Sequence, residues 1–218
     1  MKERNVTITL SKAREWLNSG DATLREVALQ AFSKDELVCS FKSITTFKEA
    51  CEVLGLDYIT RVTAVGNIAY YSKSSAAAFK LNIIRKALNL GVNLHFVENP
   101  RNSYIYCPNN PFIAKVEGFR YYKNEINSGT MEIIGEIRSE GASYYVLNSI
   151  AYFNGIEGLG NFNYSTYSGR ASADSGFLGC ASKEIAEHFG KYFGMLITEA
   201  KYADIVKDFE IVESKYAI

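Results

Sequence analysis

The sequence predicts an α+β fold in which a small helical N-terminal unit precedes a mixed or antiparallel sheet packed against two main helices, at residues 75–90 and 182–204. In those two segments apolar residues recur every three or four positions, the spacing of an amphipathic helix. Between residues 92 and 168 the apolar period becomes two, which indicates strands. Helix-capping sequences recur in the first 55 residues, which predicts the helical unit.

The N-terminal unit is expected to contain several short elements. Alternating apolar residues at 5–10 predict a half-buried strand, and Ser11 is expected to cap a helix that runs to Leu17. The last helix of the unit is expected at residues 47–54, with Gly55 ending it. Three pairs have the spacing of a capping box, in which a hydroxyl and a carboxylate satisfy the first turn of a helix: Thr23 with Glu26, Ser33 with Glu36, and Thr46 with Glu49.

The first main helix follows a predicted connector at residues 56–75, which contains Gly66. The helix is expected from Ser75 to Leu90, with Gly91 as its C-terminal stop. Its apolar stripe consists of Ala76, Phe79, Ile83, Ile84, Ala87 and Leu88.

Five strands are expected in the middle of the chain, separated by pairs of Asn, Pro, Gly and Ser residues that favour turns. They are residues 94–97, 103–107, 112–122, 131–138 and 143–150. The short connections between them favour antiparallel pairing.

The second main helix is predicted to begin after Ser182, a hydroxyl N-cap, with Glu184 and Glu187 near the positive end of the helix dipole. Its apolar stripe consists of Ile185, Phe189, Phe193, Leu196, Ile197 and Ala200. Gly190 and Gly194 lie four residues apart, and we expect them to let the helix pack closely on the sheet.

Domain organisation and charge narrow the class of protein. We expect a helix-rich module at residues 1–55 and an α+β domain at 56–218. The 24 basic and 24 acidic side chains give no net charge, which argues against non-specific nucleic-acid binding.

No apolar run approaches the length of a membrane span, and residues 1–5 do not resemble a secretion signal. These features predict a protein that is made and kept in a cytoplasm, or packed into a particle from there, without a membrane partner.

Residues 141–176 have an unusual composition, since Gly, Ser, Tyr and Asn make up more than half of them. Tyrosine offers a large amphipathic contact area at low entropic cost, as in antibody paratopes. One interpretation is therefore a recognition surface, and the other is a strand with its aromatic side chains in the core, flanked by flexible turns. The recognition interpretation predicts these binding residues: Tyr144, Tyr145, Tyr152, Phe162, Tyr164, Tyr167 and Arg170.

Few residues of the sequence are candidates for catalysis or metal binding. The two histidines, His95 and His188, belong to no metal-binding motif, and we expect both to be structural. Cys180 lies just before a helix, where the dipole could activate a thiolate, but a nucleophile also needs a nearby base. His188 would lie roughly two helical turns, ~12 Å, farther along. The four cysteines do not have zinc-site spacing, and no cofactor or metal is expected.

Three stretches of the chain are distinctive: ITLSKAREWLNSG at residues 8–20 with the helices that follow it, FKLNIIRKALNLG at 79–91, and CASKEIAEHFGKYF at 180–193. Together they resemble an uncharacterised family of crAss-like and related phages and prophages of gut Bacteroidales. The resemblance covers about half of the chain and carries no catalytic residues. The chain departs from the family pattern at residues 177–180, where FLGC replaces an Arg-Leu-Cys-type strand.

The resemblance implies a bacteriophage origin. With the tyrosine-rich segment, it predicts a non-enzymatic phage protein, either virion-associated or a host-interaction module, that binds a protein partner or a second copy of itself. One alternative is an anti-defence protein that sequesters a small nucleotide-like ligand, with Arg138 and Arg170 as candidates for phosphate binding. The other is an enzyme with an unrecognised site.

Overall fold

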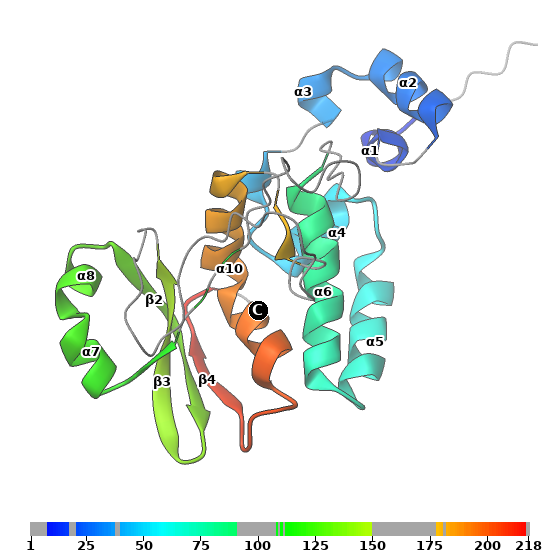
Figure 1. The fold of residues 1–218 in the computed structure, drawn as a ribbon. Helices are drawn as coiled ribbons and strands as arrows, with labels where there is room; N and C mark the ends of the chain where they lie inside the picture. The colour runs from blue at the N-terminus through cyan, green and yellow to red at the C-terminus, as the bar shows by residue number, and fades with distance from the viewer. Residues whose placement is uncertain are drawn as a thin grey trace, which may run out of the picture.

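A computed structural model describes residues 8–17, 21–37, 40–90, 108, 110, 112–149, 178–180 and 182–216. It has the predicted α+β fold, with helices packed around a four-stranded antiparallel sheet (Figure 1). The predicted strands at 94–97 and 103–107 lie outside the described residues, as does most of the predicted strand at 5–10. None of the described helices is both long enough and apolar enough to cross a bilayer.

Three short helices form the N-terminal part: α1 (Leu10–Leu17), α2 (Ala22–Ala31) and α3 (Lys34–Leu37). The predicted cap of α2 at Thr23 is wrong, because the Asp21 carboxylate accepts from the backbone N–H groups of Thr23 and Leu24. The capping box of Ser33 with Glu36 is confirmed by reciprocal hydrogen bonds. A small core of Ala13, Leu17, Ala28 and Leu37 joins the three helices.

After a 3-10 turn, η1 (Phe41–Ser43), comes α4 (Phe47–Val53) with the predicted capping box of Thr46 and Glu49. Gly55 follows it in the left-handed region (φ 67°), as expected for a glycine that ends a helix. The buried residues of α4 pack in the same core as the two main helices. The predicted unit of residues 1–55 stays a prediction, and its last helix packs against the rest of the chain.

The predicted connector at 56–75 is wrong, because most of it forms α5 (Tyr58–Ala69). Asp57 is its N-cap and accepts from the backbone N–H of Thr60 at 2.8 Å. Apolar residues cover most of the circumference of α5, and Thr60, Thr63 and Asn67 occupy the rest, so the sequence has no narrow apolar stripe from which a helix could be recognised.

The two main helices are confirmed as α6 (Lys73–Leu88) and α10 (Lys183–Tyr202). Ser72 caps α6, and Asp204, just beyond α10, accepts from the Ser72 hydroxyl and from the backbone N–H groups of Lys73 and Ser74. Asp204 therefore joins the C-terminal end of α10 to the N-terminal end of α6. The helices share the largest core, which includes Leu81, Ile84, Ala186, Phe189, Phe193 and Leu196.

The sheet has the strand order β1-β3-β2-β4: β1 (Phe112–Ala114), β2 (Met131–Ser139), β3 (Ala142–Ser149) and β4 (Glu210–Ser214). The predicted strands at 131–138 and 143–150 are confirmed as β2 and β3. The two-residue turn between them consists of Glu140 and Gly141, whose φ angles are both positive, 51° and 78°. Positive φ angles at both positions are typical of the hairpin turn whose twist matches that of paired strands. The expected strand at 112–122 is wrong beyond Ala114, where the chain forms α7 (Glu117–Tyr121) and α8 (Lys123–Asn127).

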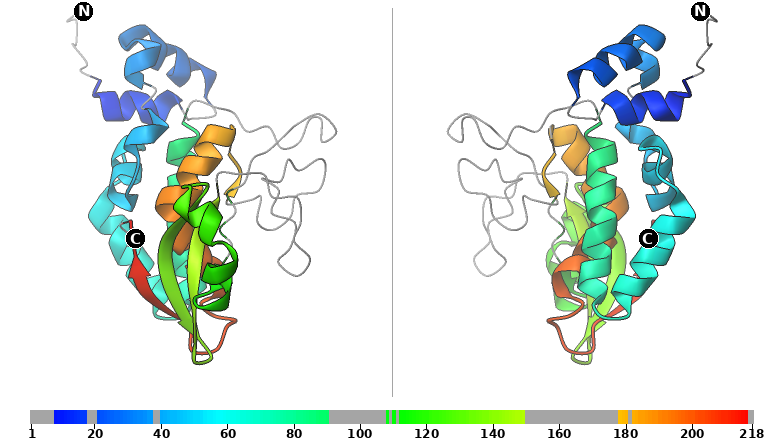
Figure 2. Two further views of the ribbon diagram at one scale, coloured as in Figure 1. Left: turned by 90° about the vertical axis from the view of Figure 1, so that its left-hand side faces the viewer. Right: turned by 90° about the vertical axis from the view of Figure 1, so that its right-hand side faces the viewer.

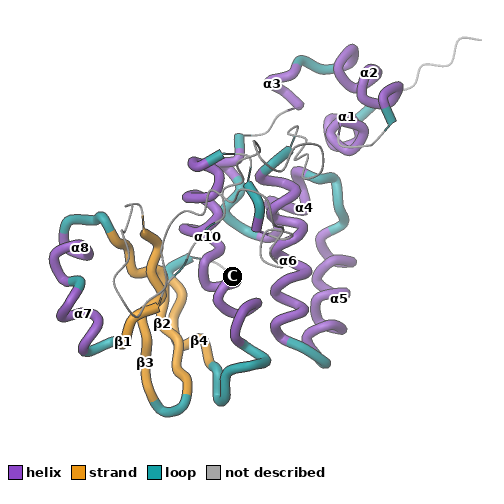
Figure 3. The backbone as a smooth tube through the Cα atoms, in the orientation of Figure 1, coloured by secondary structure: helices purple, strands orange, loops and turns teal. Residues whose placement is uncertain are grey.

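The elements form layers (Figures 1 and 2). One face of the sheet packs on α10 through Ile134, Ile137, Val146 and Met195, and the other packs under α7 and α8 through Ile113, Tyr122, Met131 and Leu147. Beyond α10 lies α6, and α5 lies on the far side of α6, as the tube in Figure 3 also shows. The expected close packing of α10 on the sheet is confirmed at Gly194, where a Cβ would collide with Ile134 and Asn110.

Candidate functional site

Two of the predicted binding residues lie in the described part of the chain. Tyr144 and Tyr145 are neighbours on β3, so their side chains point to opposite faces of the sheet. Both are half-buried. The others, Tyr152, Phe162, Tyr164, Tyr167 and Arg170, lie outside the described residues, so the binding surface as a whole stays a prediction.

Tyr144 belongs to an aromatic cluster on the α10 side of the sheet. The ring of Phe112, on β1, packs edge-on against Tyr144 at 5.6 Å between centroids and against Tyr202 of α10 at 5.4 Å. Edge-to-face pairs of this kind add to the stability that burial supplies. The cluster attaches the side chain of Phe112, on the edge strand β1, to β3 and to the C-terminal end of α10.

Tyr145 has different neighbours on the opposite face. Its ring packs against Phe119 at 6.1 Å, and the Lys115 ammonium lies 5.4 Å from the ring centroid. Lys115 also donates to Glu136 at 2.7 Å, and this hydrogen bond raises the pKa of Lys115 and lowers the pKa of Glu136. The structure therefore places Tyr144 and Tyr145 in separate surroundings.

A groove of about 420 Å³ lies where β1 leads into α7, and Tyr144 forms part of its wall. Its lining is aromatic and apolar: Phe112, Ile113, Ala114, Glu117, Gly118, Tyr121, Tyr122 and Tyr144. Tyr122 is buried, whereas Tyr121 is 69% exposed at the rim. We refer to this feature as the aromatic groove.

Gly118 determines how closely α7 approaches the sheet beside the groove. A Cβ at this position would lie 2.6 Å from the Cβ of Ile113, closer than two carbon atoms can pack. Glycine therefore allows α7 to lie directly on β1, and this brings Tyr121 and Tyr122 next to Phe112 and Tyr144.

The chemistry of the aromatic groove suits an apolar group. Among the residues that the structure describes, Glu117 is the one charged residue of the lining, and no lysine or arginine contributes to it. A phosphate would find no cation there. Arg138, one of the two candidates for phosphate binding, lies at the hairpin end of β2, where it pairs with Glu210 at 3.4 Å. The nucleotide alternative therefore gains no support from the described lining.

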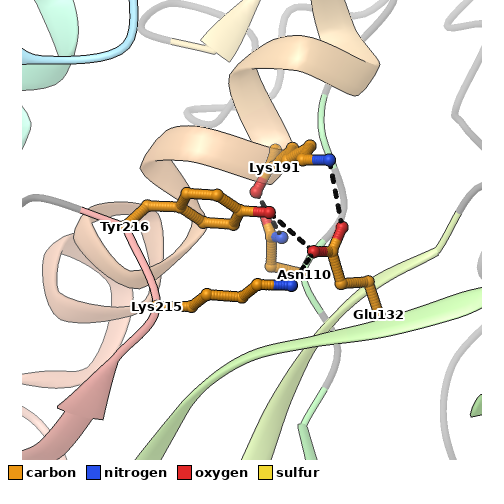
Figure 4. A network of polar contacts seen from close by, with 6 residues as sticks. Asn110, Glu132, Lys191, Lys215 and Tyr216 are labelled. Carbon is orange, nitrogen blue, oxygen red and sulfur yellow. Dashed lines mark hydrogen bonds and ion pairs between the residues drawn. The ribbon is translucent and has the colours of Figure 1, made fainter.

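A polar network, distinct from the groove, lies between β2, α10 and the end of β4 (Figure 4). Glu132 accepts hydrogen bonds from Lys215 and from the Tyr216 hydroxyl at 2.6 Å, and it pairs with Lys191 at 3.4 Å. Nearby, Asn110 donates through Nδ2 to the carbonyls of Leu147 (3.1 Å) and Gly190 (2.9 Å). The contacts of Asn110 with Gly190 and of Glu132 with Tyr216 join residues that are 80 and 84 positions apart in the chain.

The electrostatics of this network favour a structural role. Burial acts to raise the pKa of Glu132, but the hydrogen bonds from Lys215 and Tyr216 and the charges of the two lysines outweigh it, so the pKa is lowered. Burial and the bond to Glu132 raise the pKa of Tyr216. The carboxylate and the phenol are thus each held in their usual charge state, which is unlike the perturbed pair that acid–base catalysis needs.

Cys180 and His188 have structural partners. Cys180 is fully buried, and its thiol donates to the Leu178 carbonyl at 3.4 Å. His188 donates from Nε2 to the Ile44 carbonyl at 2.7 Å, and its ring packs edge-on against Phe41. Within the described ranges, no group of three His, Cys, Asp or Glu side chains is placed to hold a metal ion.

We expect His188 to make folding stability depend on pH. Burial lowers its pKa below the usual 6.5, so the folded state favours the neutral ring. The stability this provides is complete above pH 6.5 and is lost as the pH falls through the folded pKa. Urea denaturation of the wild type from pH about 7 to about 5 should show a falling free energy of unfolding.

The matched variant is His188→Gln, which retains an N–H donor for the Ile44 carbonyl but does not titrate. Its free energy of unfolding should change less than that of the wild type over the same pH range. An equal pH slope in both proteins would show that His188 is not the titrating group.

Sequence reasoning missed most of the aromatic groove. Glu117, Gly118, Tyr121 and Tyr122 were expected in the continuation of a strand over 112–122, and they belong to α7 or follow it. The adjacent pair Tyr121-Tyr122 breaks the alternation of a half-buried strand, and this was the available signal.

The chain was compared with known protein families, with curated proteins and with solved structures. No family model, curated protein or solved structure matches it.

Proposed function

We propose that this chain is a non-enzymatic binding module of a bacteriophage, and that its aromatic groove receives an extended segment of a partner protein. The observation that carries the proposal is the groove itself, in which Phe112, Tyr121, Tyr122 and Tyr144 surround about 420 Å³ of apolar space. Ligand pockets have volumes of roughly 300–1,000 Å³, and aromatic residues dominate the energetics of protein interfaces. The phage origin rests on the sequence resemblance.

An extended segment suits the position of the groove in the sheet. Among the described strands, β1 pairs with β3 on one side and lies at the edge of the sheet on the other. A peptide can add to such an edge through backbone hydrogen bonds and place alternate side chains in an adjacent pocket. Because the described lining is mainly aromatic and aliphatic, with Glu117 as its one charged residue, we expect the inserted side chain to be aromatic or aliphatic.

Panning a random peptide-display library against the immobilised full-length chain tests this proposal. The selected peptides should contain large apolar residues at alternate positions. Tyr121→Ala removes an exposed ring from the rim of the groove and should weaken binding of the selected peptides at least about tenfold, as expected for truncation of an aromatic hot spot.

Tyr71→Ala is the matched control, because Tyr71 is an exposed tyrosine that does not line the groove. It should bind the selected peptides like the wild type. Failure to enrich any peptide, or equal binding by wild type and Tyr121→Ala, would contradict the role of the groove.

The virion association is a separate part of the proposal. Mass spectrometry of purified particles from a phage that encodes this chain should detect it at high copy number. Its absence from the particles would contradict a structural role and leave the host-interaction form of the proposal.

A further inference from the structure

Helix α5 has an unusual surface for a helix at the outside of a protein. Of its twelve residues only Arg61 is charged, and none is buried. Its inner side, with Val65, packs against the main core. Its outer side also carries large apolar residues beside the exposed Thr63 and Asn67: Ile59 is 74%, Val62 43% and Tyr70, at the helix end, 84% exposed.

A continuous row of exposed apolar side chains on a helix is typical of a surface that packs on another protein. In the described part of the chain, α4 and α6 contact α5, and both lie on its inner side (Figure 1). We call the outer surface of Ile59, Val62, Gly66 and Tyr70 the α5 face. These residues follow one another at intervals of three, four and four positions, so they form one continuous row along the helix.

Nothing in the described part of the chain explains Gly66, which lies in the middle of this row. A Cβ there would meet nothing within 4 Å, and its φ does not lie in the left-handed region. Glycine destabilises a helix interior relative to alanine, and here neither the backbone nor the packing requires it. Close approach of another backbone is a physical reason for glycine at such a position.

From this we propose that the α5 face is a two-fold interface with a second copy of the chain, in which the two α5 helices cross at Gly66. Val62 lies four residues before Gly66 and Tyr70 four residues after it. In an antiparallel crossing, Val62 of each copy therefore lies against Tyr70 of the other. A closed dimer needs this kind of self-complementary surface.

Charge favours a second copy as the occupant. The α5 face carries no charged residue, so a two-fold axis brings no like charges together. A partner of strong positive or negative charge would find no complementary group on this face. The inference is independent of the aromatic groove, which α5 does not line.

The short length of α5 limits the affinity of the two copies for each other. Twelve residues span about 18 Å, whereas a stable interface usually involves roughly 20–30 residues from each partner. We therefore expect a reversible dimer with a dissociation constant in the micromolar range, about 1–100 µM.

Sedimentation velocity of the full chain over about 1–200 µM tests the interface. The mass should rise with concentration from the 24.3 kDa of one chain toward twice that value. Gly66→Leu places a side chain at the crossing point and should weaken association at least about tenfold. Since Leu favours helix and nothing lies within 4 Å of the new Cβ, its thermal midpoint at low concentration should equal or exceed that of the wild type.

Tyr121→Ala is the control, because it alters the aromatic groove and leaves the α5 face intact. It should dimerise like the wild type. A chain that remains monomeric at the highest concentration overturns the inference. So does a Gly66→Leu variant that dimerises as strongly as the wild type, since the dimer would then use another surface.

Discussion

Gly194→Ala is expected to lower the free energy of unfolding by about 2–3 kcal/mol, although alanine favours helix over glycine by ~1 kcal/mol. A Cβ at this position would overlap the fully buried side chain of Ile134 and lie 2.7 Å from the Cγ of Asn110. Overpacking a core costs ~1–3 kcal/mol. Displacing Asn110 would also break its two hydrogen bonds, to Leu147 and Gly190, each worth ~1 kcal/mol.

Gly190→Ala provides the matched comparison, one turn earlier on the same face of α10. The nearest atoms to its Cβ would be Asn148 Oδ1 at 3.0 Å and Pro108 Cβ at 3.2 Å, so small shifts suffice. Urea denaturation followed by circular dichroism should show a loss below about 1 kcal/mol for this variant. Similar losses for the two variants would contradict the close contact between α10 and β2 at Gly194.

The sequence predicts helices and strands best where the period of its apolar residues is clear over a long segment. The stripes of α6 and α10 revealed both helices because each packs one face into the shared core. Alternation revealed β2 and β3, and Glu140-Gly141 marked their turn. The same rule fails for α5, whose apolar residues extend beyond a single stripe because, in our inference, its inner and outer sides both pack on protein.

The aromatic groove was predicted only through Tyr144. Its other walls depend on the turn from β1 into α7, where Gly118 contacts Ile113 five residues earlier, a spacing that belongs to neither the helix nor the strand period. The network around Glu132 has the same origin. Lys215 and Tyr216 reach Glu132 from more than 80 residues away, and β4, which brings them there, was not predicted.

Glu132→Gln should lower the free energy of unfolding by about 2 kcal/mol at neutral pH. Hydrogen bonds to charged groups contribute ~1.5–3 kcal/mol, and the partial exposure of Lys191 and Lys215 places the expected loss in the lower part of this range. The variant loses its ion pairs with two lysines on separate elements, α10 and the segment after β4. The attachment of β4 to β2 should therefore weaken, and amide hydrogen exchange should quicken in β4 before it does in β2 and β3.

The effect of Glu132→Gln should also depend on pH. Because the folded-state pKa of Glu132 lies below the usual 4.5, its contribution is complete above pH 4.5 and is lost as the pH falls through the folded pKa. The stability difference between wild type and variant should thus shrink in acid. Glu52→Gln is the control: it removes an exposed ion pair with Lys48 at 3.8 Å and should change stability by less than about 0.5 kcal/mol. Equal losses for the two variants would mean that Glu132 contributes no more than an ordinary surface ion pair.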